Sequence, residues 1–368
     1  MSVVIALDSF KGSIPAAAAA AHLAAGWHDI DPEADLVPRP MADGGEGTLD
    51  AFAAAVPGAR RHPVRVHGPR GAEIDAQWLL LPDGTGVVEL ASTSGIELLG
   101  EDRLPWDADT TGFGEAIAAA LDAGVDRLVL GIGSSASTDG GTGMLRALGA
   151  RFRDADGVDT ARGARGLAAL AAVDVSRLRA LPPGGALVLS DVTNPLTGAA
   201  GAAAVFGPQK GLPAADVSAV DTALHRFAHL VGSHRPGVDP AAPGAGAAGG
   251  TGFALAAWGA RLVPGSGEVA DLIDLRGAMV AASLVITGEG SYDGQSAAGK
   301  VPAFVQALAA HAGVPTALVA GRLGADADIS GFAHTVSLTD LAGSAAASLA
   351  DPATWLREAG RRLARAHA

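Results

Sequence analysis

The stretch SVVIALDSFKGS, residues 2–13, decides the fold class, because a fully apolar segment runs directly into a polar loop that contains glycine. Residues Val3–Leu7 form an uninterrupted apolar run, which is typical of a parallel strand covered on both faces. Pro15 then opens an alanine-rich segment, and we expect a helix there with Ser13 as its N-cap. A strand, a loop and a helix in this order predict an α/β unit.

The same order recurs at both ends of the chain. Asp35–Val37 predicts a second strand, which leads through MADGGEG into a helix that ends near Pro57. Towards the other end, the predicted strands Ser283–Thr287 and Pro315–Ala320 flank a predicted helix, Val301–His311. This repetition predicts a three-layer domain with a parallel sheet of Rossmann or flavodoxin type, built from both ends of the chain.

The middle of the chain has a different pattern of predicted elements. Glu73–Leu81 and Thr85–Leu90 flank a turn and predict a β-hairpin. Arg127–Ile132 and Ala186–Leu189 predict further strands, with helical segments between them. We therefore expect an inserted, mixed α/β domain. The predicted domains are residues 1–60 plus 271–368, and residues 61–270.

Composition and charge exclude several classes of protein. Of the 368 residues, 49% are hydrophobic and 18% are charged, which is enough apolar material for a folded core. The formal net charge of −13 repels phosphate backbones, so we expect no nucleic-acid partner. The chain has no cysteine, which excludes disulfides, thiolate zinc sites and cysteine nucleophiles. We see neither a secretory signal nor an apolar run of about 18 residues, so we expect a cytoplasmic protein with no membrane partner.

Five segments combine glycine with Asp, Glu, Lys or Ser just after a predicted strand. They are residues 8–13, 41–48, 131–141, 191–198 and 288–296, and the segment FGPQKG, residues 206–211, lies near the fourth. In open α/β sheets, ligands bind beyond the carboxyl ends of the strands, where such loops converge. Glycine lets backbone N–H groups reach an anion, and carboxylates can hold Mg2+. The five loops together predict a phosphate and metal site.

Three familiar motifs are present only in part. Gly294–Val301 matches a P-loop, except that Val301 stands where a Ser or Thr hydroxyl should bind Mg2+. Gly131–Ala136 reads GxGxxA after a predicted strand, as a dinucleotide fingerprint does, but no clear ribose-binding acid follows. His225 and His229 are one helical turn apart, and we expect them on a solvated helix face rather than on a metal.

Taken together, the motifs resemble the bacterial glycerate kinase family, type I. They are DSFKGS, PMADGGEGT, the GIG and DGG of one loop, DVTNPLTG with FGPQKG, GAAGGTG and TGEGSYDGQSAAGK, and they run in order from about residue 3 to residue 325. In one place the chain departs from the family. Where the family pattern reads GIGGSATNDGG, Ser134, Ser137 and Thr138 replace Gly, Thr and Asn. The hydroxyl side chains replace groups that are similarly small or polar, so we expect the loop still to bind its ligand. Ser134 has less backbone freedom than the glycine it replaces.

The resemblance implies an enzyme that transfers the γ-phosphoryl group of ATP to D-glycerate with the help of Mg2+. It also implies two α/β domains with a cleft between them. The expected product is 2-phosphoglycerate, and a glycerate 3-kinase that makes 3-phosphoglycerate is the alternative. Two further alternatives are an NAD-dependent dehydrogenase of a small hydroxy acid, built on Gly131–Ala136, and a non-catalytic nucleotide-binding protein. A homodimer is left open.

Phosphoryl transfer depends on positioning and charge neutralisation, so the loops supply the candidates for the site. We expect catalytic roles for Asp191, Asp43 and Lys11, with the two aspartates as base and metal ligand in either order. The candidates for binding substrate or phosphate are Asp8, Ser9, Ser134, Ser135, Asn194, Lys210, Gly44 and Gly45. The candidates for binding the nucleotide are Gly288, Glu289, Gly290, Asp293, Gln295 and Ser296. Asp43, Asp191 and Glu289 are the candidate ligands of Mg2+.

Overall fold

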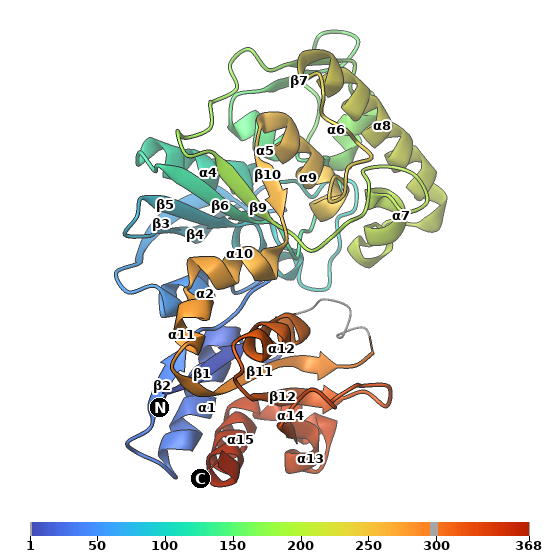
Figure 1. The fold of residues 1–368 in the computed structure, drawn as a ribbon. Helices are drawn as coiled ribbons and strands as arrows, with labels where there is room; N and C mark the ends of the chain where they lie inside the picture. The colour runs from blue at the N-terminus through green and yellow to red at the C-terminus, as the bar shows by residue number, and fades with distance from the viewer. Residues whose placement is uncertain (1, 295–300, 368) are drawn as a thin grey trace. The chain divides into compact units, whose positions relative to one another are not determined.

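The computed structural model describes residues 2–294 and 301–367 (Figure 1). The chain divides into two compact units. Unit 1 comprises residues 1–43, 50–57 and 266–368, and unit 2 comprises residues 44–49 and 58–265. Two helices, α2 (Thr48–Ala55) and α10 (Gly265–Leu272), begin in unit 2 and continue in unit 1.

Unit 1 is built on a five-stranded sheet in which every pair of neighbouring strands is parallel. The strands are β1 (Ser2–Leu7), β2 (Asp35–Pro38), β11 (Ala282–Tyr292), β12 (Thr316–Leu323) and β13 (His334–Ser337). The order across the sheet is β2-β1-β11-β12-β13, which is the flavodoxin-like order. In such a sheet the connections change direction between β1 and β11, and ligands bind at the carboxyl ends of these two strands.

Helices cover both faces of this sheet. The helices are α1 (Ala16–His28), α11 (Leu275–Met279), α12 (Val301–His311), α13 (Leu338–Ala342), α14 (Ala345–Ala350) and α15 (Pro352–His367). α1 and α15 share one core cluster with β1, β11 and β12, whereas α11 and α12 contact β1 and β11 (Figure 1). α1 and α15 cross closely at Gly26, where a Cβ would lie 1.8 Å from the backbone oxygen of Arg357. This packing fixes the strands whose ends carry the polar residues of unit 1.

Unit 2 contains a six-stranded mixed sheet with the order β10-β9-β6-β5-β4-β3. The strands are β3 (Arg60–His67), β4 (Glu73–Leu80), β5 (Thr85–Glu89), β6 (Arg127–Gly131), β9 (Ala186–Leu189) and β10 (Arg261–Val263). β3, β4 and β5 pair antiparallel, and β5, β6, β9 and β10 pair parallel. A separate pair, β7 (Arg151–Arg153) and β8 (Ala172–Asp174), is antiparallel.

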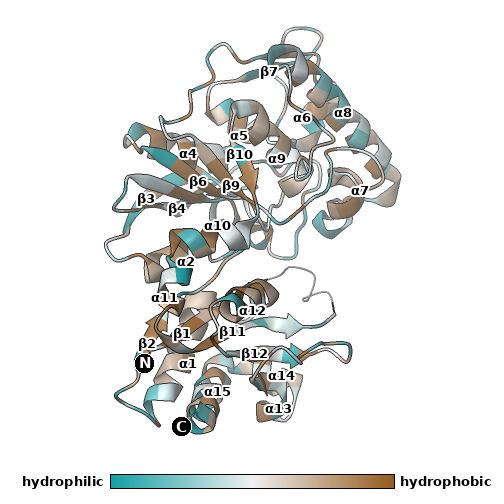
Figure 2. Cartoon of the chain, viewed as in Figure 1, coloured by the Kyte–Doolittle hydropathy of each residue, from teal (hydrophilic) through white to brown (hydrophobic). Residues whose placement is uncertain are grey.

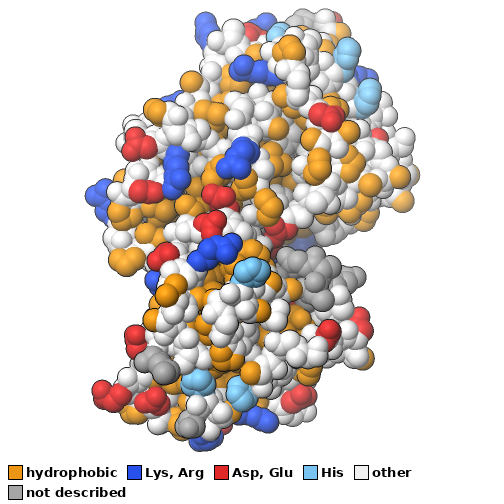
Figure 3. All heavy atoms as spheres, viewed as in Figure 1, with side chains coloured by type: hydrophobic (Ala, Val, Ile, Leu, Met, Phe, Trp, Pro, Cys, Tyr) orange, Lys and Arg blue, Asp and Glu red, His pale blue; other side chains and the backbone are white. Residues whose placement is uncertain are grey.

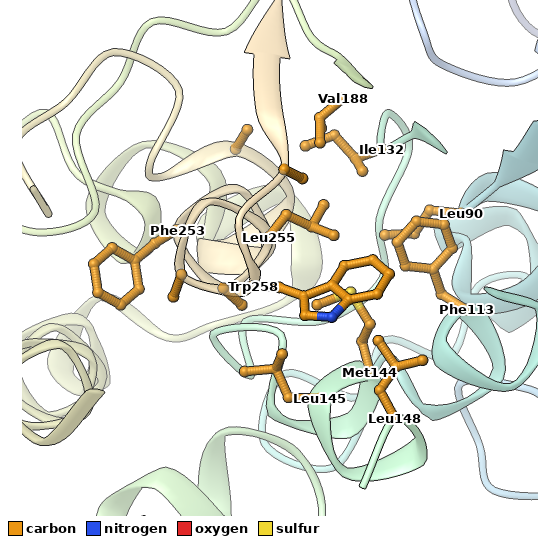
Figure 4. Close-up of a cluster of buried hydrophobic side chains, with 14 of the residues drawn as sticks. Leu90, Phe113, Ile132, Met144, Leu145, Leu148, Val188, Phe253, Leu255 and Trp258 are labelled. Carbon is orange, nitrogen blue, oxygen red and sulfur yellow. The ribbon is translucent and has the colours of Figure 1, made fainter. Parts of the chain in front are cut away.

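The helices of unit 2 enclose its apolar core. They are α3 (Ala91–Ser94), α4 (Thr111–Asp122), α5 (Thr142–Ala147), α6 (Gly163–Ala169), α7 (Ala202–Phe206), α8 (Val217–His234) and α9 (Ala247–Trp258). Three short 3-10 segments are η1 (Ile96–Leu99), η2 (Pro208–Lys210) and η3 (Ala214–Asp216). In Figure 4, Trp258 of α9 lies among the side chains of Met144, Leu148 and Phe113, so α9, α5 and α4 share one core. Figure 2 shows hydrophobic colour along β6 and β9, the central parallel strands.

The predicted α/β class is confirmed, with one parallel and one mixed sheet. Two local predictions were wrong. Ser13 is not the N-cap of α1, because it lies in a tight turn in which its N–H donates to the Phe10 oxygen, and Pro15 is the N-cap residue. β11 extends past Thr287 to Tyr292, because its end pairs with β12.

Two surface properties bear on the predicted partners. Within the described residues, no helix is both long and apolar enough to cross a bilayer. On the face shown in Figure 3, Lys and Arg side chains lie scattered among Asp and Glu side chains. The absence of a nucleic-acid partner stays a prediction.

Candidate functional site

The switch point of the unit 1 sheet carries two acidic residues. Leu7 at the end of β1 is paired with Gly288 of β11, so Asp8 and Glu289 follow at the same level of the sheet. The N–H of Asp8 donates to the Gly288 oxygen at 2.8 Å, which extends the pairing by one residue. Both side chains are buried. The structure thus brings together two residues that sequence reasoning had assigned to different ligands.

Electrostatic repulsion acts on the Asp8 carboxyl group. Burial, the neighbouring charge of Asp43 and that of Glu289 together raise the pKa of Asp8 to about 7, against the opposing effects of the Ser9 hydrogen bond and Lys11. The Ser9 N–H donates to Asp8 Oδ1 at 2.7 Å. Lys11 Nζ lies 3.9 Å from Asp43 Oδ2, and its side chain is 79% exposed, so it neutralises this group only weakly. Added positive charge at this place would stabilise the ionised carboxylates.

The glycines near the end of β11 serve close packing rather than a turn. A Cβ on Gly288 would lie 1.9 Å from the Val319 oxygen of β12, and a Cβ on Gly290 would lie 3.2 Å from the Phe10 Cα atom. The predicted nucleotide loop therefore begins as a strand, and Asp293 directly follows its last residue. Gln295 and Ser296, which were predicted to bind the nucleotide, lie outside the described residues, as does most of the partial P-loop match.

In unit 2, the segment Gly44–Leu49 lies over the carboxyl ends of the parallel strands. The Gly133 N–H donates to the Gly44 oxygen at 2.9 Å, just beyond the end of β6. Gly44 has φ +95°, and a Cβ there would lie 2.4 Å from the Leu189 oxygen at the end of β9. Only glycine fits this position, both in backbone conformation and in space.

Glu89 is a site candidate that sequence reasoning missed. It is buried at the end of β5, and its Oε1 accepts a hydrogen bond from the Thr48 N–H at 2.7 Å. A carboxylate directly after the apolar pair Val87-Val88 was the available signal. The predicted hairpin of this segment is confirmed, because β4 and β5 pair antiparallel. The hairpin pattern gave no indication that β5 also pairs in parallel with β6.

A buried lysine, Lys210, donates hydrogen bonds to the loop after β6, residues 132–141. Lys210 Nζ donates to Ser135 Oγ at 2.7 Å and to the Ser137 carbonyl oxygen at 2.5 Å. Burial lowers the pKa of Lys210 to about 7, although the charge of Asp139 acts in the opposite direction. The predicted residues Ser134, Ser135 and Lys210 therefore belong to one arrangement, and Ser134 is exposed with φ +57°.

Asp139 has a structural role in the same loop. Its carboxylate accepts hydrogen bonds from five donors: Thr110 N and Oγ1, Ser137 Oγ, Gly141 N and Gly143 N. It is completely buried. Asp139 thus ties the loop to the start of α4 and to the start of α5, although it is the N-cap residue of neither helix.

Asp191 and Asn194 follow β9 in separate environments. Asp191 is exposed, and its Oδ1 accepts a hydrogen bond from the Gly265 N–H at 2.8 Å, at the start of α10. Asn194 Nδ2 donates to the Ala200 oxygen at 2.8 Å, so its amide closes its own loop. The backbone carbonyl oxygen of Asn194 accepts a hydrogen bond from the Gly246 N–H, which connects this loop to the segment before α9.

The structure weighs against two of the partial motifs. In a dinucleotide fingerprint the helix begins within the glycine series, but here α5 begins only at Thr142, and Ala136 is buried beside Leu99 and Ala108. His225 and His229 are exposed on α8, as expected. Within the described residues, no three His, Cys, Asp or Glu side chains are grouped so that they could hold a metal ion.

Two α/β units with acids, a cation and glycine segments at the carboxyl ends of parallel strands are typical of α/β proteins that bind small ligands at these strand ends. Comparison with known proteins identifies the family within this class. The pattern of the "Glycerate kinase family" matches residues 3–368. The "Glycerate 2-kinase" of Escherichia coli K12 is 41% identical over 333 residues, 89% of this chain and 87% of that protein. The "Glycerate kinase" of Bacillus subtilis 168 is 41% identical over 332 residues, with the same coverage.

A crystal structure of an assigned glycerate kinase 2 from Salmonella typhimurium LT2 has 40% sequence identity and a TM-score of 0.84, over 100% of this chain and 98% of that chain. The chain therefore belongs to the glycerate kinase family. The predicted resemblance is confirmed, and the chain is a phosphotransferase with an alcohol acceptor. A kinase family implies ATP as the phosphoryl donor, which replaces the dehydrogenase alternative.

Proposed function

We propose that the chain transfers the γ-phosphoryl group of ATP to D-glycerate and that the product is 2-phosphoglycerate. Membership of the glycerate kinase family over residues 3–368 carries the proposal. The choice of the 2-hydroxyl rests on the relative named "Glycerate 2-kinase", which is 41% identical to this chain. 3-Phosphoglycerate remains the alternative product.

Asp191 and Asp43 are the proposed base and metal ligand. An aspartate carboxylate within reach of the attacking hydroxyl can accept its proton. Asp191 lies two residues beyond Leu189, the last residue of the short strand β9, and is exposed, so its carboxylate is accessible to a substrate. The Asp43 side chain is about a third exposed, in the company of Lys11, which we propose as a phosphate-binding cation. Either order of the two roles agrees with these positions.

Mg2+ fits the carboxylates of unit 1 in its chemistry. Mg2+ takes hard oxygen ligands and usually binds one or two carboxylates together with substrate phosphates and water. Asp43 and Glu289 both repel the charge of buried Asp8, and Mg2+ would relieve this repulsion. Asp43 and Glu289 would therefore hold the ion, and Asp191 is the candidate in unit 2. When bound, Mg2+ would neutralise charge on the phosphates of ATP.

The remaining predicted residues keep their proposed roles by position. Asp8, Ser9, Gly44, Gly45, Ser134, Ser135 and Asn194 are proposed to bind substrate or phosphate, and Gly288, Glu289, Gly290 and Asp293 to bind the nucleotide. We also propose that the predicted domains, 1–60 with 271–368 and 61–270, act as the two domains of the enzyme. A cytoplasmic location is proposed because ATP is the phosphoryl donor.

An ADP-release assay across small hydroxy acids tests the proposed function. The purified chain is mixed with ATP, Mg2+ and one acid at a time: D-glycerate, L-glycerate, glycolate or D-lactate. We expect the highest kcat/KM with D-glycerate, and phosphorus NMR of the product should show 2-phosphoglycerate. No ADP release with D-glycerate would overturn the reaction, and a spectrum of 3-phosphoglycerate alone would overturn the regiochemistry.

A further inference from the structure

Lys210 places a positive charge inside unit 2 rather than on its surface. It ends the short segment η2, and the residue is only 2% exposed. Its ammonium group contacts the loop 132–141 from the interior of unit 2, through the hydrogen bonds to Ser135 Oγ and the Ser137 oxygen. A side chain buried in this way cannot reach out to a substrate as an exposed lysine would. Any effect on a ligand must pass through the loop.

The hydrogen-bond chemistry gives Ser135 a defined orientation. When Lys210 is protonated, its ammonium group only donates, so Ser135 Oγ must be the acceptor of this bond, and the hydroxyl hydrogen is left to point elsewhere. Within residues 2–294 and 301–367, Lys210 is the hydrogen-bond partner that the structure gives this hydroxyl. A donation from a charged group also polarises the hydroxyl and makes it a better donor. Ser135 is thus prepared to donate to a negatively charged group.

The surrounding charges leave Lys210 without an ion-pair partner among the described residues. Asp139 is the acidic group that faces it, and the Asp139 carboxylate is already held by five hydrogen-bond donors. The next buried acid, Asp109, is paired with Arg162 at 2.8 Å. Arg103, from the segment beside Gly211, donates to the backbone oxygens of Ile96 and Gly100. Asp139 is therefore a nearby counter-charge, but no carboxylate of the described residues lies within ion-pair distance of the Lys210 ammonium group.

Two further features of the loop suggest an unfilled binding position. Thr138 Oγ1 is buried and has no hydrogen-bond partner in the described part of the chain, which is costly for a hydroxyl group. Ser134, at the exposed tip, has φ +57°, a left-handed conformation that non-glycine residues adopt at a cost. An orphaned hydroxyl and a strained backbone in one loop are typical of a ligand site rather than of a plain turn.

We propose that Lys210 is a positioning residue that orients the Ser135 hydroxyl as a donor toward an anionic group of a substrate. Its buried positive charge also attracts this anionic group. The anion is a carboxylate, as in D-glycerate, or a phosphoryl group, as in ATP. The inference deepens the proposed function and rests on it for the identity of these two ligands. The lowered pKa of Lys210, about 7, supports it, because an arriving anion would favour the protonated lysine.

Calorimetry on the unmodified chain tests the proposal without any turnover. D-Glycerate and sodium sulfate, a tetrahedral oxyanion that does not titrate near neutral pH, are each titrated at pH 8 in two buffers of different ionisation enthalpy. We expect at least one anion to bind with uptake of nearly one proton. Uptake with D-glycerate assigns the position to a carboxylate, and uptake with sulfate assigns it to a phosphoryl group. Binding of neither anion, or binding without proton uptake, overturns the proposal.

Two variants separate positioning from a merely structural role. Lys210→Met should abolish the proton uptake and raise the KM of the assigned substrate about 10- to 100-fold, the loss expected for a charge-assisted hydrogen bond. Ser135→Ala should raise the same KM while keeping the proton uptake, because the lysine remains. In the unmodified enzyme this KM should rise above pH 7, by up to about tenfold per pH unit, and in Lys210→Met it should not.

The control variant is Arg177→Met, which removes one exposed cation from unit 2 and should leave the KM and its pH dependence unchanged. Circular dichroism checks that each variant is folded. If Lys210→Met does not fold, Ser135→Ala and the pH profile of the unmodified enzyme decide the question. A Lys210→Met enzyme with a KM within twofold of the unmodified value, or with the same pH dependence, overturns the proposal. Anion binding with proton uptake but no ADP release would instead contradict the proposed function alone.

Discussion

Replacing Lys210 by methionine should change the stability of the fold in a pH-dependent way. The folded chain holds this ammonium group without a paired carboxylate among the described residues, and burial lowers its pKa from 10.5 to about 7. Each pKa unit corresponds to 1.36 kcal/mol, so below pH 7 the buried charge costs the fold about 5 kcal/mol. Methionine has nearly the same length and no charge, so it removes this cost.

The variant also loses two hydrogen bonds. Ser135 Oγ and the Ser137 oxygen each lose a donor, at about 1–3 kcal/mol apiece if they stay buried and unpaired. At pH 6 the removed cost and the lost bonds therefore nearly cancel, and Lys210→Met should be about as stable as the unmodified chain. This contrasts with the usual result of removing a buried, hydrogen-bonded group, which is a clear destabilisation.

The sign of the pH dependence follows from proton linkage. Between pH 7 and pH 10.5 the unfolded lysine holds a proton that the folded one has lost, so the free energy of unfolding of the unmodified chain rises with pH. The destabilisation of the fold caused by burying Lys210 falls to about 2 kcal/mol at pH 9. Relative to Lys210→Met, the unmodified chain should therefore gain about 3 kcal/mol from pH 6 to pH 9. Below pH 7 the difference should be constant.

Urea denaturation at pH 6, 7.5 and 9, without ligands, measures this difference. The comparison between variants cancels the other titrating groups, and Arg177→Met shows whether losing any positive charge has the same effect. A difference between the unmodified chain and Lys210→Met that stays constant within about 0.5 kcal/mol across this range would show that the lysine keeps its ordinary pKa. The electrostatic argument for Lys210 would then be wrong.

Three further predictions concern the loops. Ser134→Gly should stabilise the fold by about 1 kcal/mol in urea, because glycine adopts φ +57° without steric cost; a destabilised variant would refute this. Gly44→Ala should destabilise by about 2–3 kcal/mol, because its Cβ would lie 2.4 Å from the Leu189 oxygen, whereas Gly47→Ala, with a similar φ but open space, should cost only about 1 kcal/mol; equal losses would contradict the packing argument. Asp191→Asn should keep its bond to the Gly265 N–H yet lower kcat at least about 100-fold at saturating substrates, and a near-normal kcat would move the base to Asp43.

The elements that could be predicted from the sequence are those with local signals. Val3–Leu7 and Ala186–Leu189 are apolar runs bounded by polar residues or glycine, and both are strands in the structure, β1 as Ser2–Leu7 and β9 with the predicted bounds. The glycine and acid loops after these strands were found in the same way. Hydrophobic periodicity and turn residues carry this information, because each depends on a few neighbouring residues.

The features that were missed depend on pairing between distant residues. β11 extends to Tyr292 because Ser291 and Tyr292 pair with Arg322 and Leu323 of β12, which nothing within residues 288–292 indicates. The Gly44–Leu49 segment follows a strand of unit 1 in sequence but lies on strand ends of unit 2. The importance of Glu89 depends on that placement, because its partner is the N–H of Thr48. Local patterns carry no information on such contacts.

The loop 132–141 breaks two rules of local stability at once. Ser134 occupies a backbone conformation that favours glycine, and Lys210 is a buried cation with no paired carboxylate among the described residues. Neither feature helps the chain to fold, and both act on the same loop. Sequences usually agree with their fold at every level, and they depart from it where a function requires the departure. Because both costs fall at the carboxyl end of β6, where ligands bind in such sheets, the loop is better explained as a binding position than as a connection.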